Sequence, residues 1–410
     1  MSGPSLALNN LRAVVILVVV AFHSVLAYLG SLPPDLLPFN NPPYRWRSSP
    51  IVDGERWFGF DLFCAWQDVY LMSLFVLLSG MFVWPSLARK GAKSFLIDRL
   101  LRLAVPYALV VGLLMPIAHY PSYLQTAVDP SVAAYWEHFL ALPFWPNGPA
   151  WFLQILVVAA VVAAALYAFA RPLGDALARF SASVEAQPAR YFAVMLAAAI
   201  LAYVPLALVF GPWEWVQGGP FSVQLCRPLH YAFYFFAGMG IGAYGIERGL
   251  FAPDGLLVRR WRTWMAGALA SMVVWLVVTA QTFGRDGPVP LGLQLAGDVS
   301  YVVACGASCL FVIALCLRFG RRSVPLLDSL KDCAYGIYLI HYVFIIWLQY
   351  LMLAVPVPAI VKASVVFVGT LLLSWSVVAA AARRMPQVAY VIGADRRVPT
   401  GAIGAPAPPR

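Results

Sequence analysis

Long apolar runs recur from one end of the 410-residue chain to the other. A helix that crosses the hydrocarbon core of a bilayer needs roughly 17 to 25 mostly apolar residues. The runs that reach or approach this length lie at residues 13–29, 70–87, 103–118, 150–170, 191–210, 229–246, 265–280, 299–317, 334–353 and 361–382. Only 11% of the residues are charged, against about 25% in soluble domains. The sequence therefore predicts an all-α polytopic membrane protein, a bundle of about ten transmembrane helices.

The runs follow one another without a polar block between them, so we expect a single transmembrane domain over residues 1–385. Residues 386–410 follow it as a cytoplasmic tail whose end, rich in Ala, Pro and Gly, is expected to be disordered. The first run has no basic segment before Arg12 and no small-residue cleavage site after it, in contrast to a signal peptide. We interpret this run as a retained helix.

Lysine and arginine residues indicate the orientation, because cytoplasmic loops are enriched in them. With the N-terminus in the cytoplasm, the cytoplasmic segments hold all but six of the 28 basic residues. The six exceptions are Arg45, Arg47, Arg56, Arg227, Arg285 and Lys362. An even number of helices places both termini in the cytoplasm. Membrane topology thus explains the net charge of +10, and we expect no nucleic-acid partner.

The six cysteines include no CxxC pair, and most of them lie inside apolar runs, where a thiol behaves as a small apolar group. Cys305 and Cys309 are one helical turn apart, but no cluster of histidines and carboxylates accompanies them in the sequence. A soft-metal site needs several converging ligands. We therefore expect neither a disulfide framework nor a metal ion.

Two ionisable residues, Arg12 and His23, interrupt the first apolar run. Eleven residues make about three helical turns, so the two side chains share one face and lie ~16 Å apart along the axis. Arg12 falls at the cytoplasmic boundary, whereas His23 is more than halfway across a ~30 Å core. A residue at that depth normally faces the bundle interior or a wet cavity, which makes it a functional candidate. The alternative is structural: Arg12 reaches lipid phosphates, and His23 makes one buried hydrogen bond.

A basic segment with five positive charges follows the second run. Its charged residues are Arg89, Lys90, Lys93, Arg99 and Arg102. Positive-inside topology explains most clusters of this kind. The functional alternative is a cytoplasmic cradle for phosphate groups, which the planar guanidinium can bond at two points. Arg99 and Arg102 are three residues apart and share a helical face, so they are the better candidates for such a phosphate cradle. Arg89 and Lys93 are secondary candidates that topology explains better.

Two long segments on the outer side, residues 30–69 and 119–149, are too polar to span a membrane and too aromatic for plain linkers. We expect them to build a structure at the outer face. Asp61 and Asp68 lie just outside or at the top of the second predicted helix. Either carboxylate can orient His23 or an acceptor, although a solvated loop position is the simpler interpretation.

Three further residues are candidates on the substrate side. Asn147 and Trp151 stand at the outer start of the fourth predicted helix, where they can hydrogen-bond to a sugar and stack on it. Tryptophan at this level is also a common interfacial anchor. His341, in the middle of a predicted helix, either lines the same region as His23 or is a hydrogen-bonded core histidine. The remaining histidines, which we interpret as surface polar residues, are His119, His138 and His230.

Four segments that contain these residues occur in order along the chain. They are LNNLRAVVILVVVAFHS (8–24), LFVLLSGMFVWPSLARKGAKSFLIDRLLRLAVPY (74–107), GPAWFL (148–153) and CAYGIYLIHYVF (333–344). Together they resemble the membrane-bound acyltransferase family 3, and the resemblance runs from residue 8 to about residue 385. Its most specific element is arginine, ten residues, then histidine on the first helix. LFVLLSGMF and GPAWFL are most similar to the branch that contains a succinyltransferase of periplasmic glucans.

The resemblance implies transfer of an acyl group, such as acetyl or succinyl, from cytoplasmic acyl-CoA to a hydroxyl of an extracytoplasmic glycan. It also implies the inner membrane of the cell as the location. His23 and Arg12 match the family's essential pair. Arg99 and Arg102 match its basic turn, although two leucines separate them where many members have adjacent arginines. Acyl-CoA is then a donor substrate, and no permanently bound cofactor is expected.

Two mechanisms are compatible with these residues. His23 can take the proton of an acceptor hydroxyl as it attacks the thioester, because imidazole has an unperturbed pKa near ~6.5. It can instead carry the acyl group as a covalent acyl-histidine. A different class of protein is also open, namely a multi-pass transporter or flippase of a lipid or glycan with His23 as a proton relay. The enzyme predicts acceptor-dependent CoA release, and the transporter predicts transport without acyl-CoA.

Overall fold

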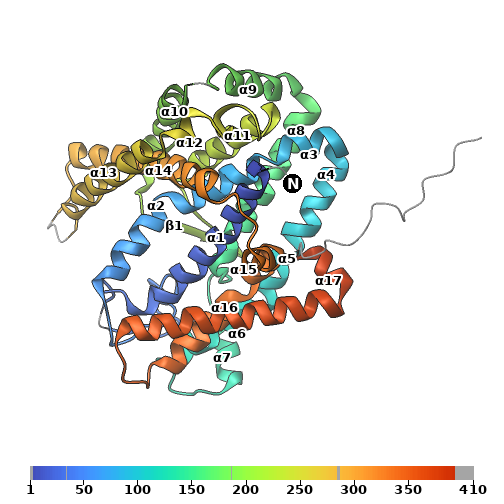
Figure 1. Cartoon of the computed structure of the whole chain (residues 1–410). Coiled ribbons are helices and arrows are strands. Elements are labelled where there is room, and N and C mark those ends of the chain that lie inside the picture. Colours follow the sequence, from blue (N-terminus) through green and yellow to red (C-terminus); the bar gives the residue numbers. More distant parts are fainter. Residues whose placement is uncertain (1–2, 34, 186, 284–286, 393–410) are drawn as a thin grey trace, which may run out of the picture.

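The computed structural model of the chain describes residues 3–33, 35–185, 187–283 and 287–392. Helices dominate this part and pack into one bundle (Figure 1). They are α1 (Gly3–Val25), α2 (Phe58–Gly80), α3 (Val83–Lys90), α4 (Ala92–Arg99), α5 (Val105–Leu109), α6 (Met115–Leu124), α7 (Val132–Leu140), α8 (Trp151–Phe169), α9 (Arg171–Ser183), α10 (Pro188–Phe210), α11 (Pro228–Tyr244), α12 (Leu256–Arg259), α13 (Trp261–Ala280), α14 (Leu291–Phe319), α15 (Pro325–Met352), α16 (Ala359–Arg384) and α17 (Pro386–Val391). The tail end that we expect to be disordered lies outside the described residues.

Nine helical segments of the described residues are long and apolar enough to cross a membrane. They are Leu6–Tyr28, Phe58–Lys90, Ala92–Leu124, Gly148–Phe169, Pro188–Phe210, Trp261–Ala280, Leu291–Phe319, Asp328–Met352 and Ala359–Arg384. The remaining predicted helix, at residues 229–246, corresponds to α11, which is shorter, with 17 residues. The prediction of an all-α polytopic membrane protein is confirmed. The described residues also hold a small antiparallel hairpin, β1 (Trp215–Gly218) and β2 (Phe221–Gln224), which apolar periodicity does not indicate.

Helix α2 begins at Phe58 rather than near residue 70, so the predicted boundary is wrong. Asp61 therefore lies in the first turn of this helix, at its outer end as expected, whereas Asp68 lies further along it. The Asp61 carboxylate accepts hydrogen bonds from the backbone N–H groups of Gly30 and Ser31, at 2.7 and 3.1 Å. A hydropathy average misses the first turns of α2 because their acidic residues lower it. The groups that bind these carboxylates are distant in the sequence, so the average does not register them.

The third span contains two π-helical turns, Leu100–Ala104 and Val110–Leu114, which join α4, α5 and α6 into one long helix. Prolines in this span lack the N–H that bonds the carbonyl four residues earlier in an α-helix. Side chains of α15 donate to two such carbonyls. The Tyr335 hydroxyl donates to Arg102 at 2.5 Å, and the Trp347 indole N–H donates to Ile117 at 3.0 Å. These bonds fix α15 against the third span.

Helices α2 and α11 approach closely because glycines line their contact. A Cβ atom added at Gly238 would lie 2.0 Å from the carbonyl oxygen of Leu77, and one added at Gly242 would lie 1.9 Å from that of Met81. Gly80 on α2 is similarly close to the α11 backbone. The pair on α11 has the GxxxG spacing that lets two helix backbones touch inside a membrane.

We predict that Gly242→Ala lowers the stability of the protein by about 1–3 kcal/mol, because the new methyl group overlaps the α2 backbone. Thermal unfolding in detergent, followed by circular dichroism, measures this change. Gly267→Ala on α13 is the matched control, since a Cβ atom there meets nothing within 4 Å and alanine favours the helix. Equal melting temperatures for the two variants would contradict the close-packing account.

The end of the bundle opposite the N-terminus, which we call the outer face, carries an aromatic cluster. It comprises Phe39, Trp46, Tyr123, Tyr135, Phe139, Leu142 and Phe144. These residues come from both outer segments that we expected to form a structure, and α7 belongs to the second of them (Figure 1). The outer cluster therefore confirms that these segments fold on the bundle and are not plain linkers.

Two of the basic residues predicted on the outer side are buried in ion pairs. Lys362 Nζ lies 2.8 Å from an oxygen of Asp53, and both side chains are almost fully buried. Arg227 Nη2 lies 2.6 Å from an oxygen of Asp68. A buried charge needs such a partner, because an uncompensated one is strongly destabilising. These residues thus hold the outer ends of the helices together and add little free positive charge there.

Candidate active site

Helix α1 carries Arg12 and His23 without interruption, from Gly3 to Val25. Their spacing corresponds to ~16 Å along the axis and ~20° around it, so both side chains start from one face. Figure 1 shows α1 (blue) near the middle of the molecule, where it packs against α2, α14, α15 and α16. One central helix thus places two ionisable side chains at two depths of the bundle.

The imidazole of His23 lies against that of His341 on α15, with 3.4 Å between Nδ1 of His23 and Nε2 of His341. Nδ1 of His23 is also 2.8 Å from the carbonyl oxygen of Val19, and Nδ1 of His341 is 2.6 Å from that of Tyr338. A carbonyl oxygen only accepts hydrogen bonds, so each Nδ1 atom carries a proton. The unprotonated Nε2 of His341 then faces the Nδ1–H of His23.

This tautomer leaves Nε2 of His23 unprotonated and, within the described ranges, without a hydrogen-bond partner. The His23 ring is partly exposed, whereas His341 behind it is completely buried. Tyr342 lies edge-on to His23, with 5.4 Å between the ring centroids. An imidazole that is held at one nitrogen and open at the other can accept a proton from a substrate. His23 therefore has the geometry of a general base, and His341 positions it.

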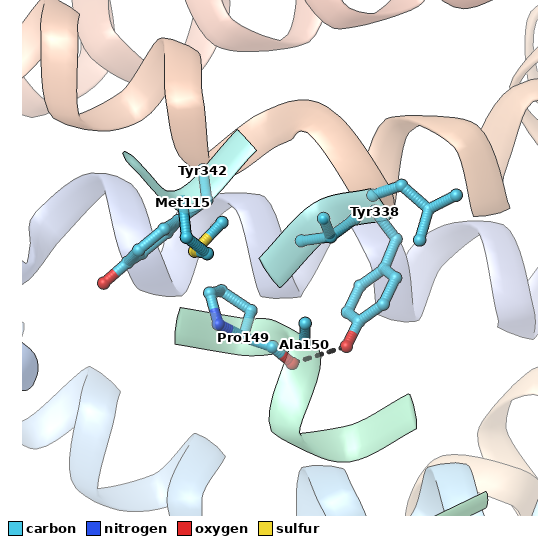
Figure 2. Close-up of a pocket in the computed structure, with 7 residues that line it drawn as sticks. Met115, Pro149, Ala150, Tyr338 and Tyr342 are labelled. Carbon is cyan, nitrogen blue, oxygen red and sulfur yellow. Dashed lines mark hydrogen bonds between the residues drawn. The ribbon is translucent and has the colours of Figure 1, made fainter. Parts of the chain in front are cut away.

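A small cavity lies beside Tyr342, and Figure 2 shows the side chains that surround it. Its lining residues are Val110, Met115, Pro149, Ala150, Tyr338, Leu339 and Tyr342. The volume is about 10 Å³, room for one water molecule. The Tyr338 hydroxyl donates to the carbonyl oxygen of Pro149 at 2.6 Å (Figure 2). The GPAWFL segment thus packs against the part of α15 that carries His341.

The glycine of this segment is required by close approach. Gly148 has a φ of 45°, in the left-handed region that side chains other than glycine rarely adopt. A Cβ atom there would also lie 2.8 Å from the Met115 sulfur and from the ring of Tyr342. Any larger residue would push against the ring that borders His23.

The predicted sugar-binding residues of the segment are tied to the outer hairpin. Asn147 is buried, and its amide donates to the carbonyl oxygen of Pro220 at 3.1 Å and accepts from the Ser222 hydroxyl at 3.0 Å. Trp151 is partly buried, with its ring centroid 5.3 Å from that of Trp215. Neither side chain contacts His23. In this structure they connect α8 to the hairpin.

Arg12 is partly buried at the other end of the face. Its guanidinium carbon lies 4.0 Å from the centroid of the Phe82 ring, and its Nη2 is 3.5 Å from the carbonyl oxygen of Leu78. No carboxylate forms an ion pair with Arg12 or Arg99 among the described residues. The positive charge of Arg99 acts on Arg12, and the carboxylate of Asp98 lies close enough to Arg99 to offset part of its charge. Such a pair is suited to an anion.

The other basic residues of the turn differ in how far their charge is balanced. Arg102 Nε lies 3.2 Å from one oxygen of Asp98, and Lys90 Nζ lies 3.1 Å from the other. Arg89 and Lys93 are exposed and form no ion pair in the part of the chain that the structure describes. The structure therefore places Arg99 near enough to Arg12 for its charge to act there. Asp98 pairs with Arg102 and Lys90 and also acts on Arg99, while Arg89 and Lys93 stand apart.

Neither of the two outer acidic candidates contacts His23. Asp61 binds the backbone that follows α1, as described above. Asp68 forms the ion pair with Arg227, whose side chain is only 3% exposed. Both carboxylates are thus engaged in holding the outer ends of helices. The structure gives His23 a histidine as its neighbour where we considered a carboxylate.

The interpretation of His119 and His230 as surface residues is wrong, because their side chains are 1% and 0% exposed. His119 lies within α6, since the third span continues to Leu124 beyond the apolar run that ends at residue 118. His230 lies in the first turn of α11, with Nε2 3.6 Å from the sulfur of Cys305. Hydropathy places a helix end too early wherever a polar residue follows an apolar run.

A family model described as an acyltransferase domain matches residues 5–379 of the chain. Because the match covers most of the chain, the protein belongs to the acyltransferase 3 family, and the resemblance of the four segments is confirmed. It is a multi-pass membrane acyltransferase. The matched range contains Arg12, His23, Arg99 and His341. No curated protein and no solved structure matches the chain.

We predict that His23→Ala lowers kcat for acyl transfer by about 10²- to 10⁴-fold, the usual contribution of a general base. His138→Ala on α7 is the matched control, because His138 is an exposed histidine far from α1 in the sequence and contacts none of the site residues. Transfer by the purified variants, normalised to folded protein, measures the effect. Full activity of His23→Ala would remove this residue from the mechanism.

Proposed function

We propose that the protein moves a small acyl group, such as acetyl or succinyl, from cytoplasmic acyl-CoA to a hydroxyl of an extracytoplasmic glycan. It works in the inner membrane of the cell, with acyl-CoA as a donor substrate and not as a bound cofactor. One observation carries this proposal. Arg12, which forms no ion pair among the described residues, and His23, whose Nε2 has no hydrogen-bond partner there, lie at two depths of one face of α1.

The arginine pair is the donor end of the site. CoA carries several phosphate oxygens, and a guanidinium bonds phosphate at two points. Arg12 forms no ion pair among the described residues, so a phosphate group can pair with it without displacing a carboxylate. Arg99 stands near it and brings a second guanidinium, although Asp98 offsets part of its charge. Arg102, Arg89 and Lys93 add positive charge around this entrance and attract the anionic donor. The extended pantetheine arm then runs along α1 from the arginines toward His23.

His23 is the reactive end. The acceptor hydroxyl gives its proton to Nε2 of His23 while its oxygen attacks the thioester carbonyl carbon. A new C–O bond forms, the C–S bond breaks, and the leaving CoA thiolate takes the proton from the imidazolium. The histidine ends the cycle neutral and ready for a new turnover. The hydrogen bond to Val19 and the contact with His341 keep the ring in place during both proton transfers.

The glycan acceptor is supported by the resemblance to the periplasmic-glucan branch and by the aromatic outer face. Trp145, Trp213 and Trp215 are exposed there. Flat aromatic rings suit the apolar faces of sugar rings.

Purified protein with acetyl-CoA or succinyl-CoA and a gluco-oligosaccharide should release CoA only when the sugar is present. Folded protein that neither binds CoA nor releases it would refute the proposal. Mass spectrometry of cell-envelope glycans, with and without the protein, identifies acyl group and acceptor.

We predict that Arg12→Gln raises the KM for acyl-CoA about tenfold or more and changes kcat less, because it removes charge-assisted hydrogen bonds to phosphate. The matched control is Arg179→Gln on α9, an exposed arginine outside the site. Steady-state kinetics with varied donor concentration separates the two parameters. An unchanged donor KM in Arg12→Gln would refute the docking role of this residue.

A further inference from the structure

His119 is the most anomalous polar group in the described residues that the mechanism does not use. Its side chain is 1% exposed, and neither ring nitrogen has a hydrogen-bond partner. A buried polar atom without a partner loses its hydration and gains nothing in return, so such groups are rare in native proteins. A histidine that is orphaned at both nitrogens indicates that a ligand or solvent group completes it in the working protein.

A second orphaned group lies beside it on the same helix. Ser122 is 5% exposed, and its hydroxyl is buried without a partner. Residues three apart in a helix share one face, so the imidazole and the hydroxyl start from one side of α6. Together they offer hydrogen-bond donors and acceptors to one ligand. Two neighbouring polar groups without partners are better explained by a binding site than by chance.

The location of His119 connects the outer face to the reactive histidine. Its ring centroid lies 4.9 Å from that of Trp46, a member of the outer aromatic cluster. On its other side it lies 5.9 Å from the ring of Tyr342, which is itself 5.4 Å from the ring of His23. His119 therefore stands on the outer approach to His23, opposite the side from which the arginine pair receives the donor.

We infer that His119 and Ser122 form a binding subsite for a hydroxyl-bearing saccharide acceptor, on the outer side of His23. This inference rests on the proposed function and adds a location for the second substrate. A hydroxyl group is both donor and acceptor, so it can satisfy an imidazole nitrogen and a serine hydroxyl together. Trp46 lies against His119 in this structure, so an acceptor that reaches the imidazole has to displace that ring.

The chemistry of the surroundings favours a neutral polyol. Among the described residues, no Lys, Arg, Asp or Glu lies close enough to His119 for its charge to act on the imidazole. Aromatic rings flank it on two sides and suit the apolar faces of a sugar. The described residues contain no group of three or more metal-ligating side chains. An anionic or metal ligand would lack the complementary charge or the ligands that it needs.

The test varies the acceptor, a gluco-oligosaccharide, at saturating acetyl-CoA or succinyl-CoA. His119→Phe keeps an aromatic ring and removes both nitrogens, and His119→Gln keeps a polar group in case the first variant is poorly folded. We expect His119→Phe to raise the acceptor KM about tenfold, with a smaller rise in His119→Gln. The donor KM should stay unchanged. His138→Phe is the matched control on the outer face.

The outcomes separate the two proposals. If wild-type protein transfers the acyl group and both His119 variants keep the wild-type acceptor KM, the subsite is refuted while the proposed function stands. If the variants change donor and acceptor parameters equally, His119 has a structural role and the subsite is also refuted. If folded wild-type protein neither binds CoA nor releases it, the proposed function fails and the inference fails with it.

Discussion

In the proposed mechanism, the chemistry depends on the hydrogen bond between Nδ1 of His23 and the carbonyl oxygen of Val19. It decides which imidazole nitrogen carries the proton, and therefore which one can accept a proton from substrate. Val19 belongs to the same helix, so an intact α1 is enough to orient the ring. His341 completes the arrangement from α15, at 3.4 Å. The bonds from Tyr335 and Trp347 to the third span fix α15 for that purpose.

The two ends of α1 face different problems of solvation. Arg12 stands near the cytoplasmic boundary, where a charged side chain can pair with a polyanionic donor that does not enter the hydrocarbon core. His23 lies deeper, among aromatic rings and beside His341. The proposed reaction, between substrates on opposite sides of the membrane, needs this division. Between Arg12 and His23, α1 carries apolar side chains.

The sequence predicts the helical bundle and the spacing of Arg12 and His23, since both follow from local periodicity. It leaves open whether His341 lines the same region as His23, because 318 residues separate the two and a helical face does not identify its neighbour. Nor could it predict that Asp61 and Asp68 serve helix ends or that His119 is buried. Hydropathy registers the polar character of a residue, whereas burial depends on partners that folding brings from elsewhere.

The central claim is that one helix guides the donor from Arg12 to His23. A cryo-electron microscopy structure with a non-hydrolysable thioether analogue of acyl-CoA tests it most directly. The account predicts phosphate density at the guanidinium groups of Arg12 and Arg99, with the acyl carbonyl beside Nε2 of His23. Phosphate density at the opposite end of the bundle, or an acyl group on a path that avoids His23, would contradict it.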